Sequence, residues 1–103
     1  MGRIARANKV DANHDEIVRA YRRLGFSVAS TAAMGKGFPD LVVGIHNITD
    51  LVEIKDGSKP PSARKLTSDQ VTFFNNWNGS VRVVNNVEDV AQHHKELREL
   101  WLT

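Results

Sequence analysis

Two acidic side chains and one lysine fall close together on what the sequence predicts to be adjacent strands. Asp40 directly precedes an apolar run, and Glu53 and Lys55 lie in the next apolar run along the chain. Carboxylate oxygens are ligands that hard cations such as Mg²⁺ prefer. Two acids and a lysine beside buried valines are costly unless something neutralises them, so the pattern favours a bound divalent cation.

The elements that would position these side chains are two short strands joined by a turn. Residues 41–45 are too few for an isolated helix and rich in β-branched side chains, which predicts a buried strand. Residues 51–55 predict a second strand that returns antiparallel to it. Because side chains alternate between faces, Glu53 and Lys55 would share one face roughly 6.5–7 Å apart, near enough to serve one phosphate. Asp40 joins that face if the connecting loop has an even number of residues.

This pattern resembles the PD-(D/E)xK nuclease superfamily, whose motif is similar to Pro39-Asp40 followed by Glu53-Ile54-Lys55. A longer set of residues resembles its VRR-NUC branch, best known from phage, bacterial and DNA-repair nucleases: Gly37-Phe38-Pro39-Asp40-Leu41, with Leu66-Thr67 and Gln70 downstream. The likeness extends from Asn8 to about Val84. Its combination of Gly-x-Pro-Asp, a preceding helix with a glutamate, and Leu-Thr-x-x-Gln is more specific than a bare Asp…Glu-x-Lys pattern.

The resemblance implies a restriction-endonuclease-like fold and metal-dependent hydrolysis of DNA that leaves a 5′-phosphate and a 3′-hydroxyl. It implies that Asp40 and Glu53 hold Mg²⁺ or Mn²⁺, with the Ile54 carbonyl as a further ligand. Glu16 would join the metal site directly or through water. Lys55 would orient or help to deprotonate the attacking water and offset charge in the transition state.

The whole chain has the size and composition of one soluble domain. It has 103 residues, of which 41% are hydrophobic and 25% charged, as is ordinary for globular proteins. The lack of cysteine excludes disulfide scaffolds, thiolate metal sites and cysteine nucleophiles. With no apolar stretch of membrane length and no signal-peptide core, we expect a cytoplasmic protein, in the host cytoplasm if phage-encoded, and no membrane partner.

Basic residues are grouped, although the formal net charge is only +2. We interpret residues 1–12 as a basic N-terminal arm before a single domain over residues 13–103. A glycine-flanked lysine and the cations around a proline pair give the candidate DNA contacts Lys36, Lys59, Arg64 and Lys65. Each patch taken alone is explained as well by solvated surface.

The segment Gly35-Lys36-Gly37 invites comparison with a phosphate-binding loop. It lacks the Ser or Thr after the lysine and the helix that should follow, so no nucleotide cofactor is expected. The glycines instead allow the backbone to approach the site closely, or permit a positive φ angle.

Helical patterns flank the strands. A first helix is predicted over residues 13–24 with Asn13 as its N-cap. Asn13-x-x-Glu16 has the spacing of a capping box, a role that does not exclude the metal-site role implied for Glu16. The second helix would begin with a capping box of Thr67 and Gln70. Because the resemblance also places this glutamine near the active site, Gln70 is an additional site candidate.

The remaining elements complete an α/β domain. Strands are predicted over residues 26–32 and 81–84, and a last helix is capped by Asn86. The order helix, three strands, helix, strand, helix predicts a small mixed β-sheet flanked by helices. His93 and His94 are adjacent in the last helix, so they cannot form an i, i+4 metal pair, and we assign them structural or surface roles.

Two other classes of function stay open: a DNA-binding module of the same fold without catalysis, and an α/β scaffold whose acids are surface charges. All expected acidic and lysine positions are filled, which speaks against the first, and the second predicts no stabilisation by cations. A domain of this size has little surface for reading bases, and no recognition helix or aromatic stacking platform is apparent. Phe74 and Trp77 are predicted to continue the apolar stripe of the second helix. A homo-oligomer, with a dimer favoured, fits structure-selective cleavage of branched or four-way junction DNA.

Overall fold

A computed structural model describes residues 11–102 of the chain. Within them the elements follow in the order α1 (His14–Arg23), β1 (Ser27–Ser30), β2 (Leu41–Ile45), β3 (Ile48–Ile54), α2 (Ser68–Asn76), β4 (Val81–Val84) and α3 (Val87–Trp101), with 3-10 turns at Ala32–Met34 and Pro61–Arg64. The predicted small mixed α/β fold and its element order are thereby confirmed. The predicted basic arm lies almost wholly outside the described residues.

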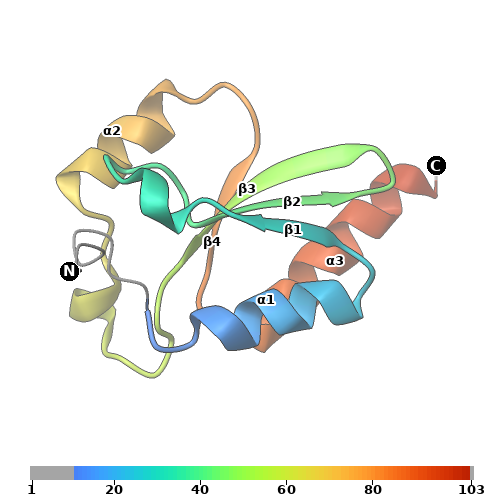
Figure 1. Ribbon diagram of the computed structural model, residues 1–103, viewed down its shortest axis with the longest axis horizontal. Coiled ribbons are helices and arrows are strands. Elements are labelled where there is room, and N and C mark those ends of the chain that lie inside the picture. Colours follow the sequence, from blue (N-terminus) through green and yellow to red (C-terminus); the bar gives the residue numbers. More distant parts are fainter. Residues whose placement is uncertain (1–10, 103) are drawn as a thin grey trace.

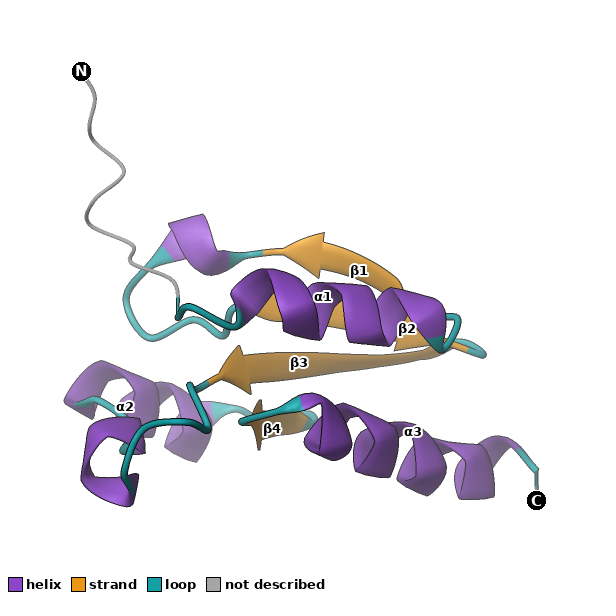
Figure 2. Ribbon diagram, turned by 90° about the horizontal axis from the view of Figure 1, so that it is seen from below, coloured by secondary structure: helices purple, strands orange, loops and turns teal. Residues whose placement is uncertain are grey.

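The described strands form one four-stranded sheet in the order β1-β2-β3-β4. β1, β2 and β3 pair antiparallel, and β4 pairs parallel to β3. A parallel neighbour needs a crossover connection, which here contains α2. Figure 1 shows α1 and α3 below the sheet and α2 above one end of it, and in Figure 2 the strand β3 points toward α2.

The core lies between the sheet and the helices α1 and α3. Ile17 and Tyr21 of α1 are fully buried there, as is Val90 of α3. The sheet contributes buried side chains that the register places on one face: Leu41, Val43, Val52, Ile54 and Val84. Removing this apolar surface from water is the main term that stabilises the fold. The other face is open at β1, where Ser27 and Ala29 are exposed, and at the start of β3, where Thr49 is exposed.

A buried chain of polar groups crosses this core. The Tyr21 hydroxyl lies 2.8 Å from His93 Nδ1, and His93 Nε2 lies 2.7 Å from Asp50 Oδ2. Burial raises the pKa of Tyr21 and lowers the pKa of His93, so both groups are neutral at pH 7. Tyr21 therefore donates to Nδ1, and Nε2–H donates to Asp50. His93 is fully buried, which confirms its structural role.

The turn between β2 and β3 is shorter than predicted. His46 and Asn47 form a two-residue turn with φ angles of 48° and 65°, and β3 begins at Ile48. Two positive φ angles in such a turn match the twist of the flanking strands. The register, continued one position beyond β2, sets Asp40 opposite Glu53. The even loop length required by the sequence argument is thus present.

Other boundaries also differ from the prediction. β1 ends at Ser30, and a 3-10 turn takes up residues 32–34. α2 ends at Asn76, where Trp77 turns into extended backbone. Among residues 11–102, no helix has the length and apolarity that crossing a bilayer would require.

The C-terminal apolar residues divide between packing and exposure. Trp101 stacks on the His46 ring at a centroid distance of 4.1 Å, so the end of α3 packs against the β2–β3 turn. Leu102, the next residue, is 67% exposed.

Candidate functional site

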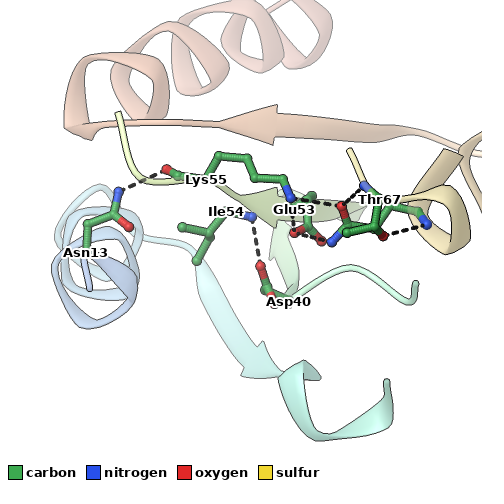
Figure 3. A network of polar contacts seen from close by, with 7 residues as sticks. Asn13, Asp40, Glu53, Ile54, Lys55 and Thr67 are labelled. Carbon is green, nitrogen blue, oxygen red and sulfur yellow. Dashed lines mark hydrogen bonds and ion pairs between the residues drawn. The ribbon is translucent and has the colours of Figure 1, made fainter. Parts of the chain in front are cut away.

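Asp40, Glu53 and Lys55 meet where β2 begins and β3 ends (Figure 3). Glu53 is only 3% exposed, and Lys55 Nζ lies 3.8 Å from Glu53 Oε2 with its side chain 12% exposed. Asp40 Oδ2 accepts a hydrogen bond of 2.9 Å from the Ile54 N–H. The structure therefore brings together the three charged residues of the motif.

Burial raises the pKa of both carboxyl groups. For Asp40, loss of solvation outweighs the hydrogen bond from the Ile54 N–H, which acts in the opposite direction. For Glu53, loss of solvation and then the negative charge of Asp40 raise the pKa to about 8, although Lys55 lowers it. Two facing carboxyl groups in a poorly solvated site share a proton at neutral pH unless a cation replaces it.

Glu53 has one oxygen with no partner. Oε2 accepts from Gln70 Nε2 at 2.9 Å, whereas Oε1 is buried without a hydrogen-bond partner among residues 11–102. An unsatisfied buried acceptor costs free energy. A cation held by Glu53 and Asp40 would satisfy this oxygen and remove the repulsion between the two acids. Mg²⁺ commonly takes one or two carboxylates and keeps water as its other ligands, so the residues present fit it.

Because residue 39 is a proline, the Ile54 carbonyl of β3 receives no strand hydrogen bond from it and is left open near the acid pair. In the antiparallel pair of β2 and β3, opposite residues exchange two backbone hydrogen bonds at every second position counted from the turn. When the register is continued beyond β2, Pro39 lies opposite Ile54 at one of these positions. Proline has no N–H to donate to the Ile54 carbonyl. The Pro39 carbonyl instead accepts from Thr31 Oγ1 at 2.7 Å. This arrangement agrees with the ligand role that the resemblance implies for the Ile54 carbonyl.

Gln70 joins α2 to the site. Its Oε1 accepts from Lys55 Nζ at 2.8 Å and from the Thr67 N–H at 2.9 Å, while its Nε2 holds Glu53. The Gln70 N–H donates to Thr67 Oγ1 at 3.2 Å, which completes the predicted capping box. One side chain thus caps the helix and fixes the separation between the lysine and the acid.

Glu16 is not part of this cluster. It is exposed on α1 and lines a shallow hollow beside Asp56. Within residues 11–102, no group of three His, Asp or Glu side chains converges to hold a metal ion.

The capping role predicted for Asn13 is wrong, because its side chain makes no cap hydrogen bond to α1. Asn13 Nδ2 instead donates to the Lys55 carbonyl at 3.2 Å (Figure 3) and to the Asn85 carbonyl at 3.0 Å. These bonds fasten the start of α1 to the ends of β3 and β4. The Asn13-x-x-Glu16 capping box is therefore absent.

Two titratable residues that the sequence analysis did not single out influence the acid pair. Asp11 raises the pKa of both Asp40 and Glu53, and His14 lowers the pKa of Asp40. His14 Nδ1 is buried without a partner among the described residues. The sequence feature that could have identified Asp11 and His14 is their position on either side of Asn13, at the start of α1.

The basic candidates for DNA contact lie in loops around the site. Lys36 is exposed and adopts a φ of 56° between two glycines, a few residues before Asp40. Lys59 and Lys65 are exposed in the segment that leads to α2, and Arg64 Nε donates to the Lys59 carbonyl at 2.8 Å. Their contact with DNA stays a prediction.

A row of aromatic rings that was not apparent in the sequence lies near the site. Phe38 meets Phe73 edge-on at 5.1 Å, and Phe73 stacks on Trp77 at 5.2 Å with 19° between the rings. A groove of about 530 Å³ follows this row, lined by Lys36, Asp69, Thr72, Phe73, Asn76 and Trp77. The sequence reading assigned Trp77 to an apolar helix stripe, yet it is 42% exposed.

Comparisons with protein-family models, with curated proteins and with solved structures give no match. The resemblance to VRR-NUC nucleases therefore rests on the motif residues themselves. The geometry adds a buried Glu53 facing a half-buried Asp40, with Lys55 and the positioning Gln70 gathered at the same end of the sheet.

Proposed function

We propose that the protein is a metal-dependent endonuclease that hydrolyses DNA phosphodiester bonds. The observation that carries the proposal is the pair of half-buried Asp40 and buried Glu53, with a Glu53 oxygen beside Lys55 that has no partner among the described residues. Mg²⁺ or Mn²⁺ bound there would polarise the scissile phosphate and lower the pKa of a bound water.

The chain's own groups divide the work. Asp40, Glu53 and the Ile54 carbonyl supply oxygen ligands of the kind that hard cations prefer. Lys55 gives one of its three N–H bonds to Gln70 and keeps the others for water or a phosphate oxygen. A nearly buried ammonium offsets the charge that develops in the transition state more strongly than an exposed one would. Gln70 acts by positioning Lys55 and Glu53.

The substrate would be held by its phosphates. Lys36, Lys59, Arg64 and Lys65 would contact the phosphates of the DNA backbone, so binding should weaken as salt is raised. A dimer would bring two sites to two strands, as cleavage of a four-way junction requires.

Incubation of supercoiled plasmid and a synthetic four-way junction with Mg²⁺, Mn²⁺ or EDTA tests the proposal. The protein is compared with Lys55→Ala and with Lys95→Ala, which removes an exposed lysine of α3. We expect cutting that needs the metal, disappears in Lys55→Ala and persists in Lys95→Ala. The products should carry a 5′-phosphate and a 3′-hydroxyl.

Other outcomes decide against catalysis. Binding of either DNA without cutting would identify a non-catalytic DNA-binding module. Neither cutting nor binding would reject a function on DNA. Cutting that Lys55→Ala leaves unchanged would reject the role of this site.

A further inference from the structure

The aromatic row beside the acid pair points to a class of substrate, an inference that rests on the proposed nuclease function. We propose that the groove along Phe73 and Trp77 binds one unpaired nucleobase of the DNA, stacked on the Trp77 indole. The preferred substrate would then carry an unpaired nucleotide next to the cut, as flaps, bulges and branch points do.

The rings of this surface pack against one another. Trp77 lies nearly parallel to Phe73, and Phe38 supports Phe73 from its edge. A Cβ at Gly79 would lie 2.8 Å from Trp77 Nε1, so the glycine is what lets the indole lie against the backbone. An aromatic surface that is already ordered loses little conformational entropy when a base stacks on it.

The lining of the groove matches a nucleotide better than it matches an apolar partner. Besides the rings, the residues that line the groove include Lys36, Asp69 and Asn76. Lysine contacts phosphate, whereas carboxylate and amide groups hydrogen-bond the edges of bases. The volume of about 530 Å³ is within the usual range for pockets that bind small ligands.

The groove is linked to the acid pair through neighbouring residues of the chain. Phe38 precedes Asp40 by two residues, and Asp69 adjoins Gln70. A Cβ at Gly37 would lie 2.3 Å from the Asp69 carbonyl oxygen, so the loop and α2 meet backbone to backbone. A base held in the groove would therefore bring an adjoining phosphate toward the carboxylates. Bases stacked within an intact duplex cannot reach such a groove unless they are extruded.

A binding experiment in EDTA separates this inference from catalysis. A duplex carries a fluorescent adenine analogue as a single unpaired base, and a second duplex carries it fully paired. Stacking on an aromatic ring should quench the unpaired analogue. Trp77→Ala should abolish the quenching and weaken binding of the unpaired substrate by roughly 5- to 100-fold, with no change for the paired duplex.

Two variants serve as controls. Trp77→Phe should restore most of the quenching, because a ring remains. Val71→Ala alters a residue of α2 that is equally exposed, at 42%, but lies outside the groove, and it should behave as wild type. Circular dichroism of each variant verifies the fold.

Each alternative outcome has a clear meaning. No quenching with the wild type, or equal weakening for paired and unpaired DNA, overturns the inference. So does sedimentation showing that Trp77→Ala only converts a dimer to monomers, since the groove would then be a contact between two copies. Quenching without any metal-dependent cutting would keep the groove and reject the nuclease. Cutting without quenching would keep the nuclease and reject the groove.

Discussion

Divalent cation binding at pH 7 should release close to one proton from the protein. Since burial and Asp40 raise the pKa of Glu53 to about 8, this carboxyl holds about 0.9 proton at pH 7 and about 0.1 at pH 9. A carboxyl group must ionise before it can serve as a ligand, so the bound proton leaves when the cation binds. Proton release should therefore be nearly complete at pH 7 and almost absent at pH 9.

Isothermal titration calorimetry with Mn²⁺, in buffers of different ionisation enthalpy, measures the number of protons released. Glu53→Gln removes both the ligand and the proton, so the variant should show neither cation binding nor release. Glu99→Gln, at an exposed position of α3, is the matched control and should behave as wild type. Cation binding with no proton release at pH 7, or with equal release at pH 7 and pH 9, would refute the reasoning.

The raised pKa of Glu53 also determines how the stability of the metal-free protein changes with pH. Above the ordinary Glu53 pKa of 4.5 the folded state keeps a proton that the unfolded state has lost, so stability falls as pH rises toward 8. The slope is about 1.4 kcal/mol per pH unit, and the whole loss is at most about 5 kcal/mol. Without metal, Glu53→Gln should therefore be more stable than wild type at pH 8, and urea unfolding at several pH values measures the difference.

Three substitutions test other parts of the structure. Gln70→Ala removes the helix cap and the bridge to the acid, so we expect a loss of about 1 kcal/mol in urea unfolding together with slower DNA cleavage; unchanged cleavage would contradict the positioning role. Gly37→Ala puts a Cβ 2.3 Å from the Asp69 carbonyl oxygen at a φ of 82°, and should cost about 1–3 kcal/mol by the same measurement; an unaltered midpoint would disprove the close contact. Tyr21→Phe leaves His93 Nδ1 without its donor and should lower stability by about 1–3 kcal/mol in thermal unfolding, whereas a variant as stable as wild type would mean that the bond contributes nothing.

Strand alternation made the centre of the site predictable. Whether Glu53 and Lys55 share a face depends only on residues two apart, and the position of Asp40 depends only on the length of one turn. The start of β3 was not predictable in the same way. Asp50 precedes the predicted strand of residues 51–55, but in the structure it lies within β3, where its carboxylate is hydrogen-bonded to His93, 43 residues away in the sequence. Local patterns carry no trace of such a partner.

The roles of side chains that hydrogen-bond backbone groups far away in the sequence were predicted wrongly for the same reason. Asn13 has the type and position of an N-cap, yet its amide serves Lys55 and Asn85, the latter 72 residues away. The apolar pattern of the second helix showed that it has an apolar side, but not what that side meets. In the structure Gln70 faces the sheet, while Trp77 opens onto a groove.

The two-residue turn at His46 and Asn47 constrains how the sequence of this protein can change during evolution. Residues that tolerate a left-handed backbone can replace one another there with little effect on the strands they connect. One inserted or deleted residue would turn Asp40 to the opposite side of the sheet from Glu53 and divide the acid pair. The identities of the two turn residues can vary during evolution, but a change of one residue in the length of the turn would be selected against.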